Sequence, residues 1–306
     1  PTYNPLVDTA TVGIGASAHP FGVRTDNAIT SATLISPRFG FNYDVNGDAG
    51  MVVRGGVGLF AGRTPYVWAS NAYTNTGLEQ VQLVCTGANV PAFTISPDSQ
   101  PTACATAGAL VLPKPSVVYF DKSFKLPQTM RASLGLDRRL PWGMTGSFDA
   151  LYTKSIHQFI LTDDNIAPNG RTAAGEAGRV LYGIPSGSSF TLNRRTSVAN
   201  QVLRQYNSNK DYSYSLTFRL EKRFLNGDEL SAGYTYGRSY DLMSYSSDIS
   251  SSLLNFSTLD GTLENRNLRP SWFDIPHSVR VSGTIAMPYG VRFSLFYTGR
   301  SGRPRG

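Results

Sequence analysis

The stretch between residues 38 and 62 contains two short runs of alternating side chains with a polar turn between them. Phe39, Phe41 and Tyr43 alternate with arginine, glycine and asparagine in the first run, and valines alternate in the same way in the second. Successive side chains of a strand point to opposite faces, so each run has one apolar and one polar face. The intervening Asp44–Gly50 supplies an Asn-Gly pair, which suits a tight turn. The pattern predicts a β-hairpin.

The same unit recurs three times further along the chain. Alternating runs flank short turns near Pro141, at Asn226-Gly227 and near Pro288. Long stretches rich in Ser, Thr, Asn and Pro join the hairpins, and their lack of alternation predicts loops. These predicted loops span residues 1–32, 63–125, 154–210 and 241–276.

Short turns at one end and long loops at the other are typical of transmembrane barrels, whose strands run for about 9–11 residues. Charged residues make up only 16 % of the chain, against about 25 % in ordinary soluble domains. The sequence has no run of about 18 apolar residues, which excludes a transmembrane helix. We therefore predict an all-β fold, an antiparallel transmembrane β-barrel, present here in part as about eight strands in four hairpins. A secreted β-sandwich also alternates, but its polar faces carry more Lys and Glu.

The sequence gives no reason to expect catalysis, a cofactor or a metal. His19, His157 and His277 lie far apart, without cysteines or carboxylates at metal-ligand spacing. The Asp-x-Asn-x-Asp run at Asp44 resembles the start of a calcium loop, but Gly55 stands where a bidentate glutamate belongs. The formal net charge is +7, yet the basic residues form no dense stripe, so we expect no nucleic-acid partner.

Six arginines occupy the polar phase of their strands and are predicted to face the lumen of the barrel. One interpretation is a basic lining that holds an acidic plug surface or attracts anionic solutes. The other is a lumen with charges of both signs, since Asp149 and Glu221 share that phase. The six residues are Arg38, Arg54, Arg131, Arg219, Arg280 and Arg292.

The chain has two cysteines, Cys85 and Cys104, both in the stretch after the first hairpin. Two cysteines in an exported chain usually pair, so we predict a disulfide that closes a loop of about 20 residues.

Three hairpin sequences resemble those of one family, the Oar-like TonB-dependent receptors, which carry a carboxypeptidase-regulatory-like domain before the plug. The similar stretches are SPRFGFNYD with VVRGGVGLFAGR, LEKRFLNGDELSAGYTYGRSYD, and WFDIPHSVRVSGTIAMPYG. The resemblance implies an outer-membrane barrel of about 22 strands around a plug, driven by TonB.

On this resemblance residues 1–306 are expected to be an internal segment of one barrel domain, without the plug and the N-terminal domains. The implied function is movement of a large solute across the outer membrane without catalysis. The implied partners are membrane lipid, the plug, the remaining strands and, indirectly, TonB. Two alternatives stay open: a small self-closing pore or adhesin, and a secreted β-sandwich that acts as a binding module.

Overall fold

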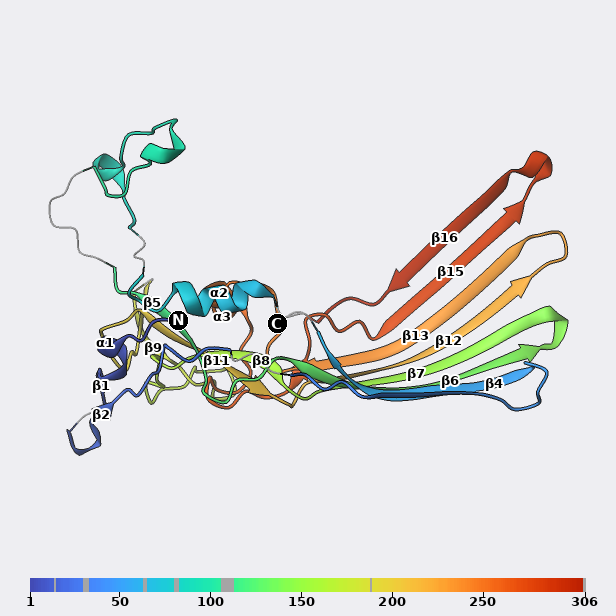
Figure 1. Cartoon of the computed structure of the whole chain (residues 1–306), viewed down its shortest axis with the longest axis horizontal. Helices are drawn as coiled ribbons and strands as arrows, with labels where there is room; N and C mark the ends of the chain where they lie inside the picture. The colour runs from blue at the N-terminus through green and yellow to red at the C-terminus, as the bar shows by residue number, and fades with distance from the viewer. Residues whose placement is uncertain are drawn as a thin grey trace.

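The computed structural model describes residues 1–13, 15–29, 33–62, 65–79, 83–105, 113–187 and 189–304. The chain forms a curved antiparallel sheet and, at one end of it, a folded module (Figure 1). No helix in these ranges has the length and apolar character needed to cross a membrane.

The curved sheet, called the wall below, contains the four predicted hairpins, each with a short turn at the end far from the module. Every strand pairs with its neighbours in antiparallel fashion, and the short β14 (Arg269–Pro270) adds to the end of β13. The partial barrel wall predicted from the sequence is confirmed. In sheet order the strands are β3 (Arg38–Asp44), β4 (Met51–Ala61), β6 (Gln128–Leu140), β7 (Met144–Ser155), β12 (Tyr212–Arg223), β13 (Glu229–Asp241), β15 (His277–Ala286) and β16 (Arg292–Arg300).

Two of the turns have the same backbone. In η4 (Pro141–Gly143) and η5 (Pro288–Gly290) the central Trp142 and Tyr289 have φ of 63° and 67°. A bulky residue rarely adopts positive φ, and a glycine at positive φ follows each one. Both rings are exposed at the far end of the wall, where amphipathic aromatic side chains suit a membrane interface.

The stretches expected to be loops contain a second sheet. It has the order β5 (Ser116–Phe120), β11 (Gln201–Ser208) and β8 (Gln158–Asp163), with β11 parallel to β5 and antiparallel to β8. Only Ile156 and His157 separate β7 from β8, and residues 209–211 separate β11 from β12. The central hairpins of the wall therefore continue beyond it into the module.

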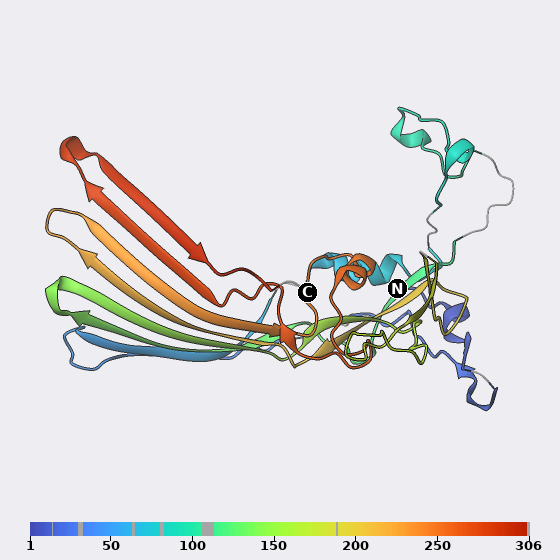
Figure 2. The ribbon, with the colours of Figure 1, turned by 180° about the vertical axis from the view of Figure 1, so that it is seen from behind.

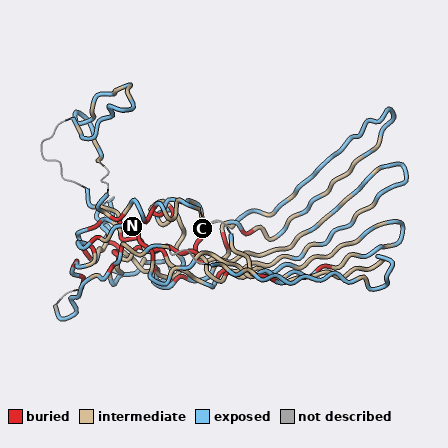
Figure 3. Tube along the Cα trace, in the orientation of Figure 1, coloured by how far each residue is buried: buried red, intermediate tan, exposed pale blue. Residues whose placement is uncertain are grey.

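The module is built in three layers around this small sheet. On one side Phe159, Leu203 and Leu253 are buried with residues of α2 (Tyr66–Thr74) and α3 (Ser250–Phe256). On the other side Val7 of α1 (Pro5–Asp8) and Val23 pack against the sheet. Burial on both faces is what a parallel strand pair requires. Figure 3 shows most of the buried residues in the module, whereas the wall is mainly intermediate or exposed.

The remaining elements are short and belong to the module or to its projections. Residues 1–32, expected to be loop, contain α1 and a two-residue strand pair. The short elements are β1 (Thr11–Val12), η1 (Gly15–Ser17), β2 (His19–Pro20), η2 (Gly87–Asn89), η3 (Pro97–Ser99), β9 (Gly183–Ser186) and β10 (Ser189–Leu192).

Candidate functional site: the two faces of the wall and the loop module

The strand register places all six arginines on one face of the wall, the polar face. Gly58 lies opposite both Arg38 and Arg131, and Arg54 stands four residues from Gly58 on the same strand. Directly opposed residues share a face, and so do residues separated by an even number of positions.

The same rule links the later strands. Arg219 lies opposite Gly233, and Gly233 lies opposite Arg280. Arg292 pairs with Ala286, an even number of positions from Arg280. That this face lines a lumen stays a prediction at this point.

Arg54 is the most strongly paired of the six. Its Nε lies 2.8 Å from Asp137 and its Nη2 lies 2.7 Å from Asp149. Gly135 stands opposite Arg54, and a Cβ there would come within 2.8 Å of the guanidinium carbon. The glycine therefore leaves room for the charge network. Asp137 was missed in the sequence, where only Asp149 and Glu221 were placed on this face.

The other five arginines differ in their partners. Arg219 forms an ion pair with Glu221, two residues along its own strand. Arg38 and Arg131 both lie over the ring of Phe60, at 4.5 and 5.7 Å from its centroid. Among the described residues, Arg280 and Arg292 form no ion pair. The polar face thus carries charges of both signs, and those of the six arginines that form no ion pair among the described residues lie on β3, β6, β15 and β16.

The opposite, apolar face of the wall is exposed, whereas a water-soluble protein would bury an apolar surface of this size. Phe218 is 55 % exposed and Leu295 is 66 % exposed. The apolar face is formed by the alternate residues of each strand, among them Tyr214, Leu216, Phe218, Val281 and Leu295. Exposed apolar surface on this scale marks an interaction site.

Charges on the apolar face are confined to its two ends. Arg138 and Lys222 lie near the short turns, and Lys154 and Arg238 lie near the module. The carboxylate of Asp274 pairs with Arg238 at 2.9 Å. The structure describes every residue of the eight wall strands, and within them the apolar face carries no Asp or Glu. The uncharged band between these ends has the length of a membrane-spanning strand.

Tyrosines gather on the apolar face at the module end of this band. The rings of Tyr212 and Tyr240 stack with centroids 5.0 Å apart, and Tyr152 lies 6.4 Å from Tyr212. The Lys154 ammonium is 5.7 Å from the Tyr212 ring centroid. Aromatic rings followed by cations are the usual composition of a membrane boundary.

Buried polar groups hold the module together. The carboxylate of Asp163 accepts hydrogen bonds from the backbone N–H groups of Asn165 and Val202, at 2.9 and 3.0 Å. Burial outweighs these bonds and raises the pKa of Asp163 to about 6. Burial likewise raises the pKa of Asp211 to about 6, although its carboxylate accepts from Leu242 N–H at 3.1 Å.

A second, partly buried network crosses the small sheet. The Tyr119 hydroxyl donates to Asp164 at 2.5 Å, and Arg204 lies 3.1 Å from the same carboxylate. Arg204 also reaches Asp121 at 3.3 Å. These contacts join three segments that are distant in sequence, so they fix how the long connections fold together.

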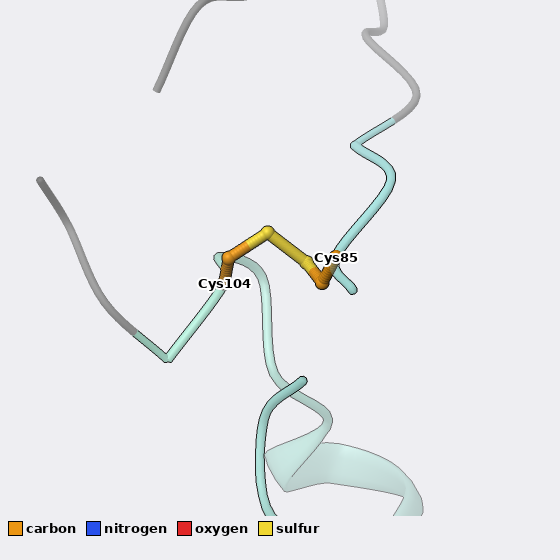
Figure 4. The surroundings of a disulfide bond; sticks show 2 residues. All are labelled: Cys85 and Cys104. Atoms are coloured by element: carbon orange, nitrogen blue, oxygen red, sulfur yellow. A yellow bond between two sulfur atoms is a disulfide. The ribbon is translucent and has the colours of Figure 1, made fainter. Parts of the chain in front are cut away.

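Cys85 and Cys104 form a disulfide, as the sequence predicts, with Cα atoms 5.5 Å apart (Figure 4). The bridge closes the base of a segment that Figure 1 shows in teal, projecting from the module. Within it, Phe93 is 91 % exposed and Ile95 is 90 % exposed.

His277 and the acidic turn make local contacts. His277 Nδ1 lies 2.7 Å from the Tyr234 hydroxyl. The Asp44 carboxylate accepts hydrogen bonds from the backbone N–H groups of Asn46, Gly47 and Ala49, so it caps its turn. Within the described ranges, no group of three or more His, Cys, Asp or Glu residues is placed to hold a metal ion.

A one-layer antiparallel sheet with an exposed apolar face and a charged opposite face defines the wall of a membrane β-barrel. Residues 5–298 match the family model described as an outer membrane beta barrel domain. The chain belongs to this family, and its location is the bacterial outer membrane.

Solved structures with a similar arrangement are outer-membrane proteins. The siderophore receptor PirA from Pseudomonas aeruginosa is 9 % identical, with a TM-score of 0.41 over 87 % of this chain and 33 % of that one. The outer membrane transporter YddB from Escherichia coli is 12 % identical, with a TM-score of 0.49 over 89 % and 29 %. The siderophore receptor PirA from Acinetobacter baumannii is 12 % identical, with a TM-score of 0.44 over 86 % and 28 %. The chain thus spans about a third or less of each. No curated protein matches it.

Proposed function

We propose that this chain is an internal part of the barrel of a TonB-dependent outer-membrane receptor, which moves a large solute across the membrane without catalysis. The observation that carries the proposal is a membrane wall open at both edges whose hairpins resemble the Oar-like receptors. The most distinctive of these hairpins, WFDIPHSVRVSGTIAMPYG, contains β15 and its turn.

The free edges of β3 and β16 support a larger barrel. In the described residues neither strand pairs with the other, and the two lie at opposite sides of the sheet (Figure 2). Lipid offers no hydrogen bonds to an open sheet edge, so membrane sheets close. The remaining strands of the receptor would pair with these two edges. A self-closing pore would instead need β3 and β16 to meet.

The proposed orientation places the short turns in the periplasm and the module outside the cell. Figures 1 and 2 show α2 and α3 on the side of the sheet toward which β15 and β16 curl. In a closed barrel that side is the lumen. The module would therefore cover part of the outer mouth, where a solute first meets the receptor.

The polar face would then contact a plug. Arg54 already has two carboxylates of the wall as partners, whereas Arg280 and Arg292 form no ion pair in the described chain. A buried guanidinium without a partner is costly, and carboxylates bind it in a bidentate fashion. Arg38 and Arg131 also lack an ion pair but lie over the Phe60 ring, so we assign charge contacts of the plug first to Arg280 and Arg292 on β15 and β16.

Planar bilayer conductance of the full-length protein tests this assignment. The wild type is expected to be closed, and an Arg280→Ala/Arg292→Ala double variant should show transient openings because its plug is held less firmly. A Lys154→Ala variant, which removes a cation from the apolar face, is the matched control and should stay closed. A wild type that conducts anions continuously would contradict the receptor and support the pore alternative.

A further inference from the structure

A groove of about 530 Å³ crosses the apolar face in the half of the wall nearest the short turns. Its lining includes the small residues Gly146 and Ala232, which lie on either side of Leu220 in the strand register, and the paired rings of Phe148 and Phe218. Position 146 has little room for a side chain, because a Cβ there would come within 3.0 Å of a Leu140 methyl group and 3.6 Å of a Leu220 methyl group.

The groove lies at the centre of the sheet. Its residues come mainly from β6, β7, β12 and β13, and further strands flank them on both sides. Strands added at the free edges of β3 and β16 would leave the groove uncovered. In a protein of the outer membrane, the surface of this face is covered by lipid.

One cation lines the end of the groove nearest the turns, and a second lies beyond that end on the same face. Arg138 is one of its lining residues and lies opposite Gly146. Lys222 lies opposite Met144, one step nearer the turn and two strands away from Arg138. The Lys222 ammonium lies 4.7 Å from the Phe224 ring centroid. The apolar face has no carboxylate within the wall strands to neutralise either cation, so both can attract an anion at the membrane boundary.

We propose that this groove is a binding site for one anionic phospholipid, with an acyl chain against Phe148, Phe218 and Ala232 and the headgroup phosphate at Arg138, on the side of the groove where Lys222 adds a second positive charge. The site rests on the orientation proposed above, which puts the turn end in the phospholipid-containing inner leaflet, but not on solute transport. Arginine suits this role because its planar fork binds phosphate in a bidentate manner.

Native mass spectrometry of the detergent-purified full-length protein tests the headgroup contact. Phosphatidylglycerol should be retained in preference to phosphatidylethanolamine of the same acyl chains. An Arg138→Gln/Lys222→Gln variant should lose most of that preference, at about fivefold in affinity for each cation removed. Lys154→Gln, at the other boundary of the same face, should retain it.

A second pair of variants tests the groove itself. Ala232→Phe adds a ring to the groove lining without a change in charge and should release both lipids. Ala150→Phe adds the same bulk to the same face outside the groove and should have no effect. Equal retention of the two lipids by wild type and by every variant would show a non-specific lipid layer only, and would overturn the proposal. Displacement of phosphatidylglycerol by millimolar inorganic phosphate would instead assign the cations to a free anion and would equally contradict a lipid site.

Transport and lipid binding can fail separately. A protein that conducts ions continuously in bilayers but still prefers phosphatidylglycerol loses the receptor function and keeps the lipid site. A protein that stays closed in bilayers but shows no preference for phosphatidylglycerol keeps the receptor function and loses the lipid site.

Discussion

The wall and the module are built from similar strands but place their apolar side chains in different surroundings. In the wall a strand has one apolar face, which stays exposed in the isolated chain, as the 55 % exposure of Phe218 illustrates. In the module both faces of β8 and β11 are covered, and Phe159 is 1 % exposed. The wall therefore depends on lipid as its apolar environment, whereas the module has its own core. The two regions should respond independently to mutation.

The largest expected effect is in the module core. Phe159 stacks on Trp68 with ring centroids 4.1 Å apart and is buried with α3 and β11. Phe159→Ala should destabilise the module by about 3–5 kcal/mol, from lost burial and a cavity. Hydrogen exchange of residues 158–163 and 201–208 in the full-length protein would measure it.

The control for this change is Phe218→Ala in the wall, where lipid fills the space. We expect little increase of exchange in the module for that variant. Loss of protection in both regions with Phe159→Ala alone would show that the wall and the module unfold as one unit, contrary to the comparison.

The next effect concerns the phase of the wall. Leu216→Arg places a cation on the apolar face at mid-membrane and should cost about 2–4 kcal/mol of unfolding free energy. Thr217→Arg places the same side chain on the polar face, among hydroxyls and charges, and should be tolerated. Urea titration of the full-length protein in lipid vesicles gives both values. Equal losses for the two variants would mean that the faces are assigned wrongly.

The wall could be predicted from the sequence because a period of two is enough to define it. Each strand of the wall needs only alternation and a nearby turn, and the lipid on its apolar side is the same everywhere. The pairing of Phe148 with Phe218, for example, follows from two adjacent hairpins of the predicted order. The ion pairs of Arg54 were harder to predict, because Asp137 lies close to a turn and was not assigned to a face of the strand.

The module could not be predicted in this way. Its strands are short apolar runs, such as Val117–Phe120 and Phe159–Leu161, which alternation does not reveal. β5 pairs with β11 across a long separation in sequence, so the partner is set by tertiary packing rather than by a local turn. Ion pairs such as that of Arg204 with Asp164 depend on that packing in turn.

The disulfide provides a smaller, local test. Cys85→Ser/Cys104→Ser should lower the stability of the closed segment by about 3 kcal/mol, the entropy of a loop of this length. The wall and the module core should be unaffected, because the bridge joins neither. Protease sensitivity confined to residues 85–104 is the expected result. Two reactive thiols in the denatured, non-reduced wild type would contradict the pairing.

The smallest expected effect is a pH dependence of the module that the wall should not share. Asp163 and Asp211 have pKa values of about 6, raised by burial, against about 4 in an unfolded chain. Between these values the folded module binds more protons than the unfolded one. Its stability is therefore greatest below about pH 4 for these two groups and falls as pH rises through about 6.

An Asp163→Asn variant isolates this effect, because the amide oxygen can still accept from the N–H groups of Asn165 and Val202. The folding stability of the wild-type module should fall by about 1–3 kcal/mol per carboxyl between pH 4.5 and 7.5. The variant should show only the part of this fall that comes from Asp211. Hydrogen exchange of residues 158–163, corrected for the intrinsic rate at each pH, gives the difference. A variant with the same slope as the wild type would mean that Asp163 ionises as it does in the unfolded chain, and that backbone hydrogen bonds rather than burial decide its charge.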